Sequence, residues 1–177
     1  MPTVSKKAFV DPTAIVCGKV IVEENVFIGP YAVIRADEVN EQGEMEAITM
    51  KKDTNIQDGV VIHSKAGAAV TIGERSSIAH RSIVHGPCTV GDDVFIGFNS
   101  VVFNTQIGDG CVIRHNCVVD GVNLPNLFHI PPMTNIGSIK DLENILPVTP
   151  DFVAFSESVV SANHTLVEGY QKMANEL

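Results

Sequence analysis

Residues 72–102 read IGERSSIAHRSIVHGPCTVGDDVFIGFNSVV, and this stretch decides the fold. An aliphatic side chain stands at every sixth position of the stretch, namely at Ile72, Ile78, Val84, Val90, Ile96 and Val102. This period matches neither the alternation of a β-strand nor the 3.6-residue turn of an α-helix. Self-similarity at a fixed period is the signature of a repeat architecture, in which stacked units bury a continuous core.

The same six-residue spacing continues on both sides of this stretch. The further anchors are Val10, Val16, Val22, Ile28, Ile34, Ile56, Ile62 and, after a five-residue step, Ile107, Ile113 and Val119. Two insertions, residues 40–49 and a shorter one near residues 66–71, interrupt the series, and Met50 serves as an anchor if the register crosses the first of them. Insertions into a stacked coil leave it at the corners, so we expect two loops there.

Composition indicates a β-rich body followed by a helical tail. Residues 1–123 contain 33 Val and Ile and no Leu, whereas all six Leu lie at or beyond Leu124. β-Branched side chains lose rotamer freedom in helices and suit strands. We therefore expect the β body over residues 1–123, and a return segment plus a C-terminal helix over residues 124–177 of the same single domain.

Two helices are expected in this second part. Residues 138–146 are compatible with a short helix. Residues 156 to about 175 fit a longer one, because apolar side chains recur there at helical spacing. The stripe consists of Val159, Leu166, Val167, Tyr170 and Met173.

The six-residue repeat resembles that of the hexapeptide-repeat family, whose chains coil as left-handed parallel β-helices. In that fold three hexapeptides complete one triangular coil of about 18 residues, and coils stack at about 4.8 Å. The resemblance implies a mainly β chain, a left-handed parallel β-helix with a C-terminal α-helix packed along it. It leaves function open, because acyltransferases, hydrolases and scaffolds share the fold.

Charge and cysteine usage exclude several classes of function. The formal net charge is −9, so binding to the phosphates of nucleic acid is not expected. No apolar run reaches membrane-spanning length and no signal-peptide core is present, so we expect a cytoplasmic protein without a membrane partner. The four cysteines form no CxxC pair, and Cys88, Cys111 and Cys117 fall where the repeat needs small residues, which favours buried thiols.

The register of the repeat predicts where His63 and His85 lie. Each follows an anchor by one residue, and the anchors at 62, 72, 78 and 84 span one complete coil. The two imidazoles should therefore share one face, with backbones about 4.8 Å apart, where both reach one metal ion. Carrying the register back through Met50 places Arg35 on the same ladder.

His80 follows its anchor by two residues and lies on the preceding face, with Gln57. It is badly placed to join His63 and His85 within one chain, but a neighbouring copy could supply it. A closed trimer is a permitted symmetry, and three neutral nitrogens with an open fourth position describe a catalytic zinc site. The alternative is that three histidines merely occupy exposed positions on a β-helix.

Three segments resemble the gamma-class carbonic anhydrases and the related domain of a carboxysome assembly protein. They are IRADE at residues 34–38, NIQDGVVIH at 55–63 and IAHRSIVHGPCTVGDDVFIG at 78–97, and with ANHTLVEGY in the tail the likeness covers roughly residues 8–175. The resemblance implies a homotrimer whose metal is held by His63 and His85 of one subunit and His80 of the next. The metal is usually Zn²⁺, with iron or cobalt as alternatives, and the reaction is reversible hydration of CO₂ to bicarbonate by a metal-bound hydroxide.

The resemblance also implies roles for residues beside the histidines. Arg35 matches an active-site arginine and Asp37 its acidic partner at the subunit interface, although the pair also reads as a plain salt bridge. Glu38 matches a carboxylate placed near the metal-bound water, where it accepts a proton or holds bicarbonate.

Three polar residues match the other wall of the family's site. Asn55 and Gln57 match a polar pair near the metal, and Gln57 would orient the nucleophile by hydrogen bonding. Asn163 matches an asparagine of the C-terminal helix. Because it lies on the apolar stripe it needs a partner, and it either caps a buried backbone group or reaches the metal pocket.

One departure from the family concerns proton transfer. The best-known member carries a long acidic loop just after its first metal-binding histidine, whereas here His63 is followed by SKAGAAVTIGE, without an acid before Glu74. The earlier insertion carries Glu41, Glu44 and Glu46. These side chains form either a substitute proton shuttle or a solvated acidic loop.

Two other classes of function remain open from the sequence. A hexapeptide acyltransferase or thioesterase acting on CoA esters would use a histidine as base and no metal. A catalytically weak scaffold relative would keep the site without turnover.

Overall fold

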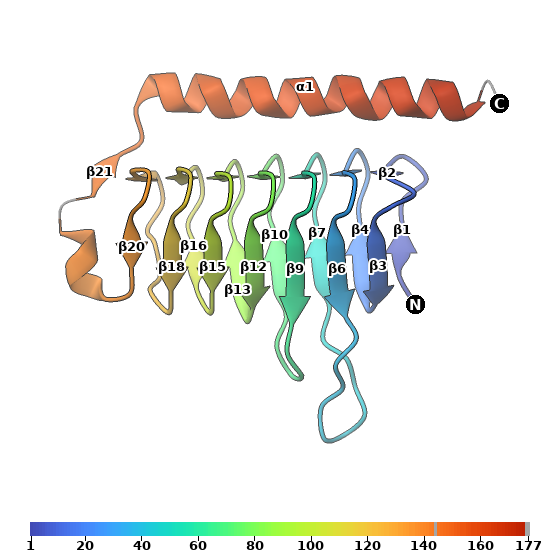
Figure 1. The fold of residues 1–177 in the computed structure, drawn as a ribbon, viewed down its shortest axis with the longest axis horizontal. Helices are drawn as coiled ribbons and strands as arrows, with labels where there is room; N and C mark the ends of the chain where they lie inside the picture. The colour runs from blue at the N-terminus through green and yellow to red at the C-terminus, as the bar shows by residue number, and fades with distance from the viewer. Residues whose placement is uncertain (144, 176–177) are drawn as a thin grey trace.

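Figure 1 shows, as a computed structural model, a prism of stacked coils with one long helix along it. The structure describes residues 1–143 and 145–175, so residues 176 and 177 of the predicted second part lie outside it. Each coil adds one strand to each of three sheets in turn, and the strands of successive coils pair in parallel. The parallel β-helix with a C-terminal helix is therefore the predicted fold. We call the three sheets faces A, B and C.

The strands of each face follow one another along the prism. Face A contains β1 (Thr3–Val4), β4 (Val20–Val22), β7 (Ile48–Met50), β10 (Val70–Ile72), β13 (Cys88–Val90) and β16 (Gln106–Ile107). Face B contains β2 (Phe9–Val10), β5 (Phe27–Ile28), β8 (Asn55–Ile56), β11 (Ser77–Ile78), β14 (Phe95–Ile96), β17 (Val112–Ile113), β19 (Phe128–Ile130) and β21 (Leu146–Pro147). Face C contains β3 (Ile15–Gly18), β6 (Val33–Ala36), β9 (Val61–Ser64), β12 (Ile83–Gly86), β15 (Val101–Phe103), β18 (Val118–Asp120) and β20 (Asn135–Ile136).

The predicted anchors fill the interior of the prism. From Val22 to Val119 each of them is at most 2% exposed, while Val10 and Val16 are half-buried at the open N-terminal end. Met50 is fully buried and pairs with Val22 below and Ile72 above. The register therefore does cross the 40–49 insertion, which leaves the prism as a long loop between β6 and β7 (Figure 1).

The coils continue beyond residue 123, where the sequence interpretation ended them. Leu124 bridges to Ile107, Ile130 pairs with Ile113, and Ile136 pairs with Val119, so the coils run to the end of β20. The nearby prolines suggested an irregular segment. Proline is tolerated here because the strand N–H groups of one coil donate hydrogen bonds to the next coil along the chain. No parallel strand follows the last coil, so the N–H that proline lacks is not needed there.

The return segment is less helical than predicted. In the described part of residues 138–146 the helical structure is a 3₁₀ turn, η1 (Ile139–Leu142), and β21 then pairs antiparallel with β19. Residue 144 lies outside the described residues.

The long helix α1 (Pro150–Asn175) lies along face B (Figure 1). It begins at residue 150 rather than 156, because proline fits the first turn of a helix. Among its described side chains Asn163 and Val167 are buried, whereas Leu166 and Met173 of the predicted stripe are 44% and 61% exposed. Val159 packs against the prism and Tyr170 stacks on Phe9, so the helix presents most of the predicted stripe to face B, and only Leu166 and Met173 of that stripe face solvent. Among the described residues no helix is long and apolar enough to cross a membrane.

Candidate functional site

The ladder predicted on face C is present. Arg35 of β6, His63 of β9 and His85 of β12 are in direct register, because each follows its anchor by one residue and points outward from the prism. The same ladder extends to Cys17 before Arg35 and to Phe103 after His85. Those two positions share the same offset from Val16 and Val102, a signal the sequence interpretation did not use.

The two imidazoles of the ladder lie at the separation that one metal ion requires. His63 Nδ1 and His85 Nε2 are 3.3 Å apart. Two nitrogens bound at 2.0–2.1 Å to one tetrahedral ion lie about 3.4 Å apart. His85 Nδ1 is 3.0 Å from the carbonyl oxygen of Gly86, so a proton on Nδ1 leaves Nε2 with a free lone pair facing His63. The histidine pair therefore fits a metal ion.

Two carboxylates flank the far nitrogen of His63. His63 Nε2 lies 3.5 Å from Glu38 Oε1 and 3.9 Å from Asp37 Oδ1. A proton on Nε2 beside these carboxylates leaves Nδ1 free for a metal, the usual outer-shell arrangement of a ligating histidine. The backbone N–H of Ala66 donates to Glu38 Oε2 at 3.0 Å, so the short second insertion holds Glu38 in place.

Arg35 and Asp37 form an ion pair within the chain. The guanidinium donates to Asp37 Oδ2 from Nε at 3.1 Å and from Nη2 at 3.0 Å. These bonds lower the pKa of the Asp37 carboxyl below its ordinary value and raise the pKa of Arg35. Cys17 Sγ also lies 3.8 Å from Asp37 Oδ2, one coil below Arg35. We call Arg35, Asp37, Glu38, His63 and His85 the face C group.

The remaining predicted site residues lie on face B and at its corner with face C. Asn55 and Gln57 flank the buried anchor Ile56 and point outward, Asn55 being fully buried beneath α1. Asn163 of α1 is 7% exposed, and its Nδ2 donates to the Val159 carbonyl at 2.7 Å. His80 stands at the corner. We call Asn55, Gln57, His80 and Asn163 the face B group.

The surroundings of His80 contain two residues that sequence reasoning missed. His80 Nδ1 lies 3.6 Å from Asp58 Oδ2, and the His80 ring lies 5.3 Å from that of Phe98. Asp58 and Phe98 follow their anchors by two residues, as His80 does, so the repeat register would have found them. Among the described residues no group of three or more His, Cys, Asp or Glu is arranged so that it could hold a metal ion. One chain thus presents two separate half-sites.

The acidic insertion does not reach either half-site in any described contact. The chain of this loop closes on itself, because Asn40 Oδ1 accepts from the backbone N–H groups of Gln42 and Glu44. Glu41 and Glu44 are exposed and Glu46 is half-buried. This arrangement agrees with a solvated loop.

The outward side chains differ between the three faces. Face A presents a polar ladder of Thr49, Thr71 and Thr89, and face B is covered by α1. Face C presents an aliphatic ladder beside the histidines, and no described residue covers it. Its members are Ile15, Val33, Val61, Ile83, Val101 and Val118.

Comparison with known proteins finds relatives along nearly the whole chain. Residues 69–104 match the family described as Bacterial transferase hexapeptide (six repeats). A carbonic anhydrase of Methanosarcina thermophila is 35% identical, over 97% of this chain and 75% of its own length. A carboxysome assembly protein CcmM of Nostoc sp. is 33% identical over 94% of this chain, but over only 31% of its own length. The carnitine operon protein CaiE of Escherichia coli is 36% identical over 67% of this chain and 54% of its own.

Solved structures with the same fold are more distant in sequence. A putative acetyltransferase of Bacillus cereus has a TM-score of 0.80 at 19% identity, covering 97% of this chain and 92% of its own. A hexapeptide transferase family protein of Anaplasma phagocytophilum has a TM-score of 0.78 at 23% identity, covering 96% and 92%. At these identities the likeness shows the shared fold alone.

Proposed function

The chain belongs to the gamma-class carbonic anhydrase family of hexapeptide-repeat proteins, and on that premise we propose that it is a metal-dependent carbonic anhydrase. The reaction is the reversible hydration of CO₂ to bicarbonate. The observation that carries the proposal is the 3.3 Å separation of His63 Nδ1 and His85 Nε2 on face C. The 35% identity to a carbonic anhydrase over nearly the whole chain supports it.

The metal would be held by His63 and His85 together with His80 of the partner subunit. When bound there, a divalent ion supplies Lewis-acid activation of water at neutral pH. Zn²⁺ is the first choice for three imidazole ligands, with iron or cobalt as alternatives.

The chain's own polar groups act on the reacting oxygen and on the product. Glu38, fixed by the Ala66 N–H, accepts a proton or holds bicarbonate beside His63. Gln57 orients the attacking oxygen by hydrogen bonding. The Arg35–Asp37 pair orders the edge of the site, a role that a plain salt bridge fulfils.

Self-association is the step that would bring the two half-sites together. In a closed trimer the face C of one subunit meets the corner between faces B and C of the next. That contact covers the aliphatic ladder around Ile83 and Val101, which no described residue covers within one chain. It would also bring His80 and Gln57 of one subunit opposite His63 and His85 of its neighbour.

The experiment combines metal analysis with stopped-flow CO₂ hydration on the wild type, on His85→Ala and on His129→Ala as a control outside both groups. We expect the wild type to bind metal and to be active. We expect His85→Ala to lose metal and to lose more activity than the roughly 10–100-fold typical of outer-shell changes. His129→Ala should retain both. A metal-free but active wild type would point instead to acyl chemistry on CoA esters, and a metal-loaded inactive trimer to a scaffold.

A further inference from the structure

A row of polar side chains is buried between face B and α1. On β5, β8, β11 and β14 the outward residues in register are Phe27, Asn55, Ser77 and Phe95, each at most 5% exposed. Two aromatic rings therefore enclose two polar groups. Among the described residues Asn55 Nδ2 and Oδ1 and Ser77 Oγ have no hydrogen-bond partner, although all three atoms are buried.

Such groups require partners that the described residues of this chain do not supply. An unpaired buried amide or hydroxyl costs about 1–3 kcal/mol, and native proteins nearly always satisfy these groups, with ordered water where protein cannot. Asn163 of α1 lies on the same side of the prism and is nearly as buried as Asn55 and Ser77. Asn55 and Ser77 thus describe a site for ordered water beneath the helix.

One end of the row leads to the face B half-site. Gln57 stands two residues beyond Asn55 and points to the same side of the strand, and its Oε1 is also buried without a described partner. Two residues of strand span about 7 Å, a gap that a few hydrogen-bonded waters bridge.

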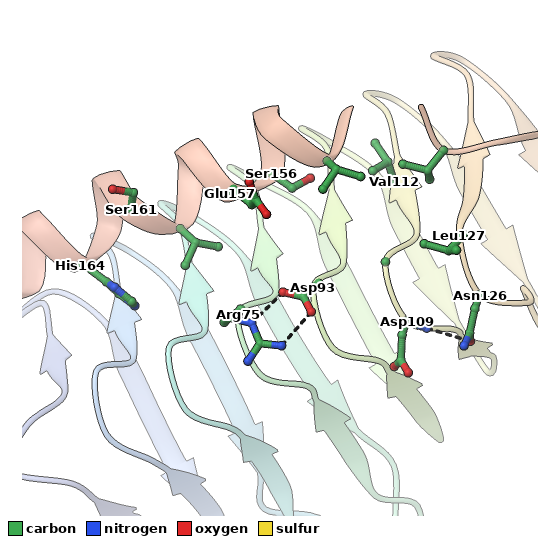
Figure 2. A pocket seen from close by; sticks show the side chains of 14 residues that line it. Arg75, Asp93, Asp109, Val112, Asn126, Leu127, Ser156, Glu157, Ser161 and His164 are labelled. Atoms are coloured by element: carbon green, nitrogen blue, oxygen red, sulfur yellow. Dashed lines mark hydrogen bonds and ion pairs between the residues drawn. The ribbon is translucent and has the colours of Figure 1, made fainter. Parts of the chain in front are cut away.

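The other end of the row leads to solvent through His164. Asp53, two residues before Asn55, has its Oδ1 3.1 Å from His164 Nε2, and Asn25 Nδ2 donates to the same oxygen at 3.0 Å. His164 adjoins Asn163 on α1 and lines a cleft of about 750 Å³ between the helix and the turns that join faces A and B. Figure 2 shows its ring extending from the helix toward the coils.

The cleft is accessible to proton acceptors from solution. The His164 side chain is 40% exposed, whereas that of Asp53 is 12% exposed. The other charged groups that line the cleft are Asp109, Glu157 and the Arg75–Asp93 ion pair. The His164 ring thus has the Asp53 carboxylate on its inner side and solvent on its outer side. This position suits a group that takes up a proton on one side and releases it on the other.

We infer that His164 and the buried row from Gln57 through Asn55 form the route by which the hydration reaction releases its proton. The inference rests on the proposed function. CO₂ and water give bicarbonate and one proton; waters held by Gln57 and Asn55 pass that proton to the His164 imidazole, and the imidazolium gives it to a base in the cleft. Histidine is suited to this because it gains and loses a proton near neutral pH. The route accounts for turnover without an acid between His63 and Glu74.

The test compares His164→Gln with Ser161→Ala, a control at another position of α1 that lines the same cleft. Glutamine retains hydrogen bonding but carries no proton. In weak buffer we expect kcat of His164→Gln to fall about 100-fold or more and to recover with added imidazole. Exchange of ¹⁸O between CO₂ and bicarbonate at equilibrium, which measures interconversion itself, should stay unchanged, as should metal content. Ser161→Ala should match the wild type throughout.

Two outcomes overturn the route while leaving the proposed function intact. One is a kcat of His164→Gln equal to that of the wild type in weak buffer. The other is a high-resolution crystal structure of the assembly without water bonded to Asn55 and Ser77. A wild type that shows no ¹⁸O exchange at all would refute the proposed function, and the route with it.

Discussion

The Arg35–Asp37 pair couples a single residue's protonation to folding. The guanidinium lowers the pKa of the Asp37 carboxyl below 3.8, the ordinary value of an aspartate. A carboxyl with a lowered pKa in the folded state stabilises that state above the unfolded pKa and loses the contribution as pH falls through the folded pKa. Both side chains are substantially exposed, at 47% and 33%, so solvent screens the pair and the contribution is small.

We therefore expect Arg35→Gln to lower stability at pH 6, and the difference from the wild type to shrink as the pH falls toward 2 and the Asp37 carboxyl takes up a proton. Urea unfolding at the two pH values measures the difference, and NMR titration of the carboxyl should show a higher pKa in the variant. A stability difference that persists undiminished at pH 2 would assign the role of Arg35 to packing rather than to charge.

At the scale of elements, the close stacking of coils leaves some corners room only for glycine. A Cβ on Gly73 would lie 2.3 Å from the carbonyl oxygen of Gly91 in the next coil, a backbone atom that cannot rotate away. Gly169, in the interior of α1, has no atom within 4 Å of the same added carbon. The close approach of the next coil therefore requires glycine at position 73, whereas the space around position 169 would accept a larger residue.

We expect Gly73→Ala to destabilise the protein by about 1–3 kcal/mol, because overpacking forces the backbone to shift. Gly169→Ala should be neutral or stabilise the helix by up to about 1 kcal/mol. Thermal and urea unfolding of the two variants measure both effects. Equal stability of the two would mean that the coils separate at this corner at little cost.

How far the sequence predicts these elements depends on whether local residues or contacts with distant segments fix them. The anchors are local and periodic, so register, the buried Met50 and the pairing of His63 with His85 follow from counting. The end of the coils does not, because Pro125 is acceptable only where no further coil stacks above it. Nor does the placement of Glu38, because it depends on the N–H of Ala66, which belongs to a different loop.

On the scale of the whole molecule, the three faces differ in what contacts them, because their outward side chains differ. Face A is polar and exposed to solvent. Face B is covered by α1, and the Tyr170 ring of this helix stacks on the Phe9 ring with 4.2 Å between the ring centroids. Face C alone combines β-branched side chains with the ladder of Arg35, His63 and His85. A long exposed apolar surface of this kind marks an interaction site.

Ile83 and Ile21 offer a matched test of this assignment, since they are 38% and 37% exposed on faces C and A respectively. We expect Ile83→Arg to break the proposed trimer into monomers, because the charge would be buried against a neighbouring subunit, whereas Ile21→Arg should leave the assembly unchanged. Light scattering with size-exclusion chromatography measures the mass. In the proposed arrangement one chain offers only two of the three histidines at a site, so metal should be lost together with the trimer. A monomeric Ile83→Arg variant that retains wild-type metal affinity would separate the metal site from the interface and contradict the shared arrangement.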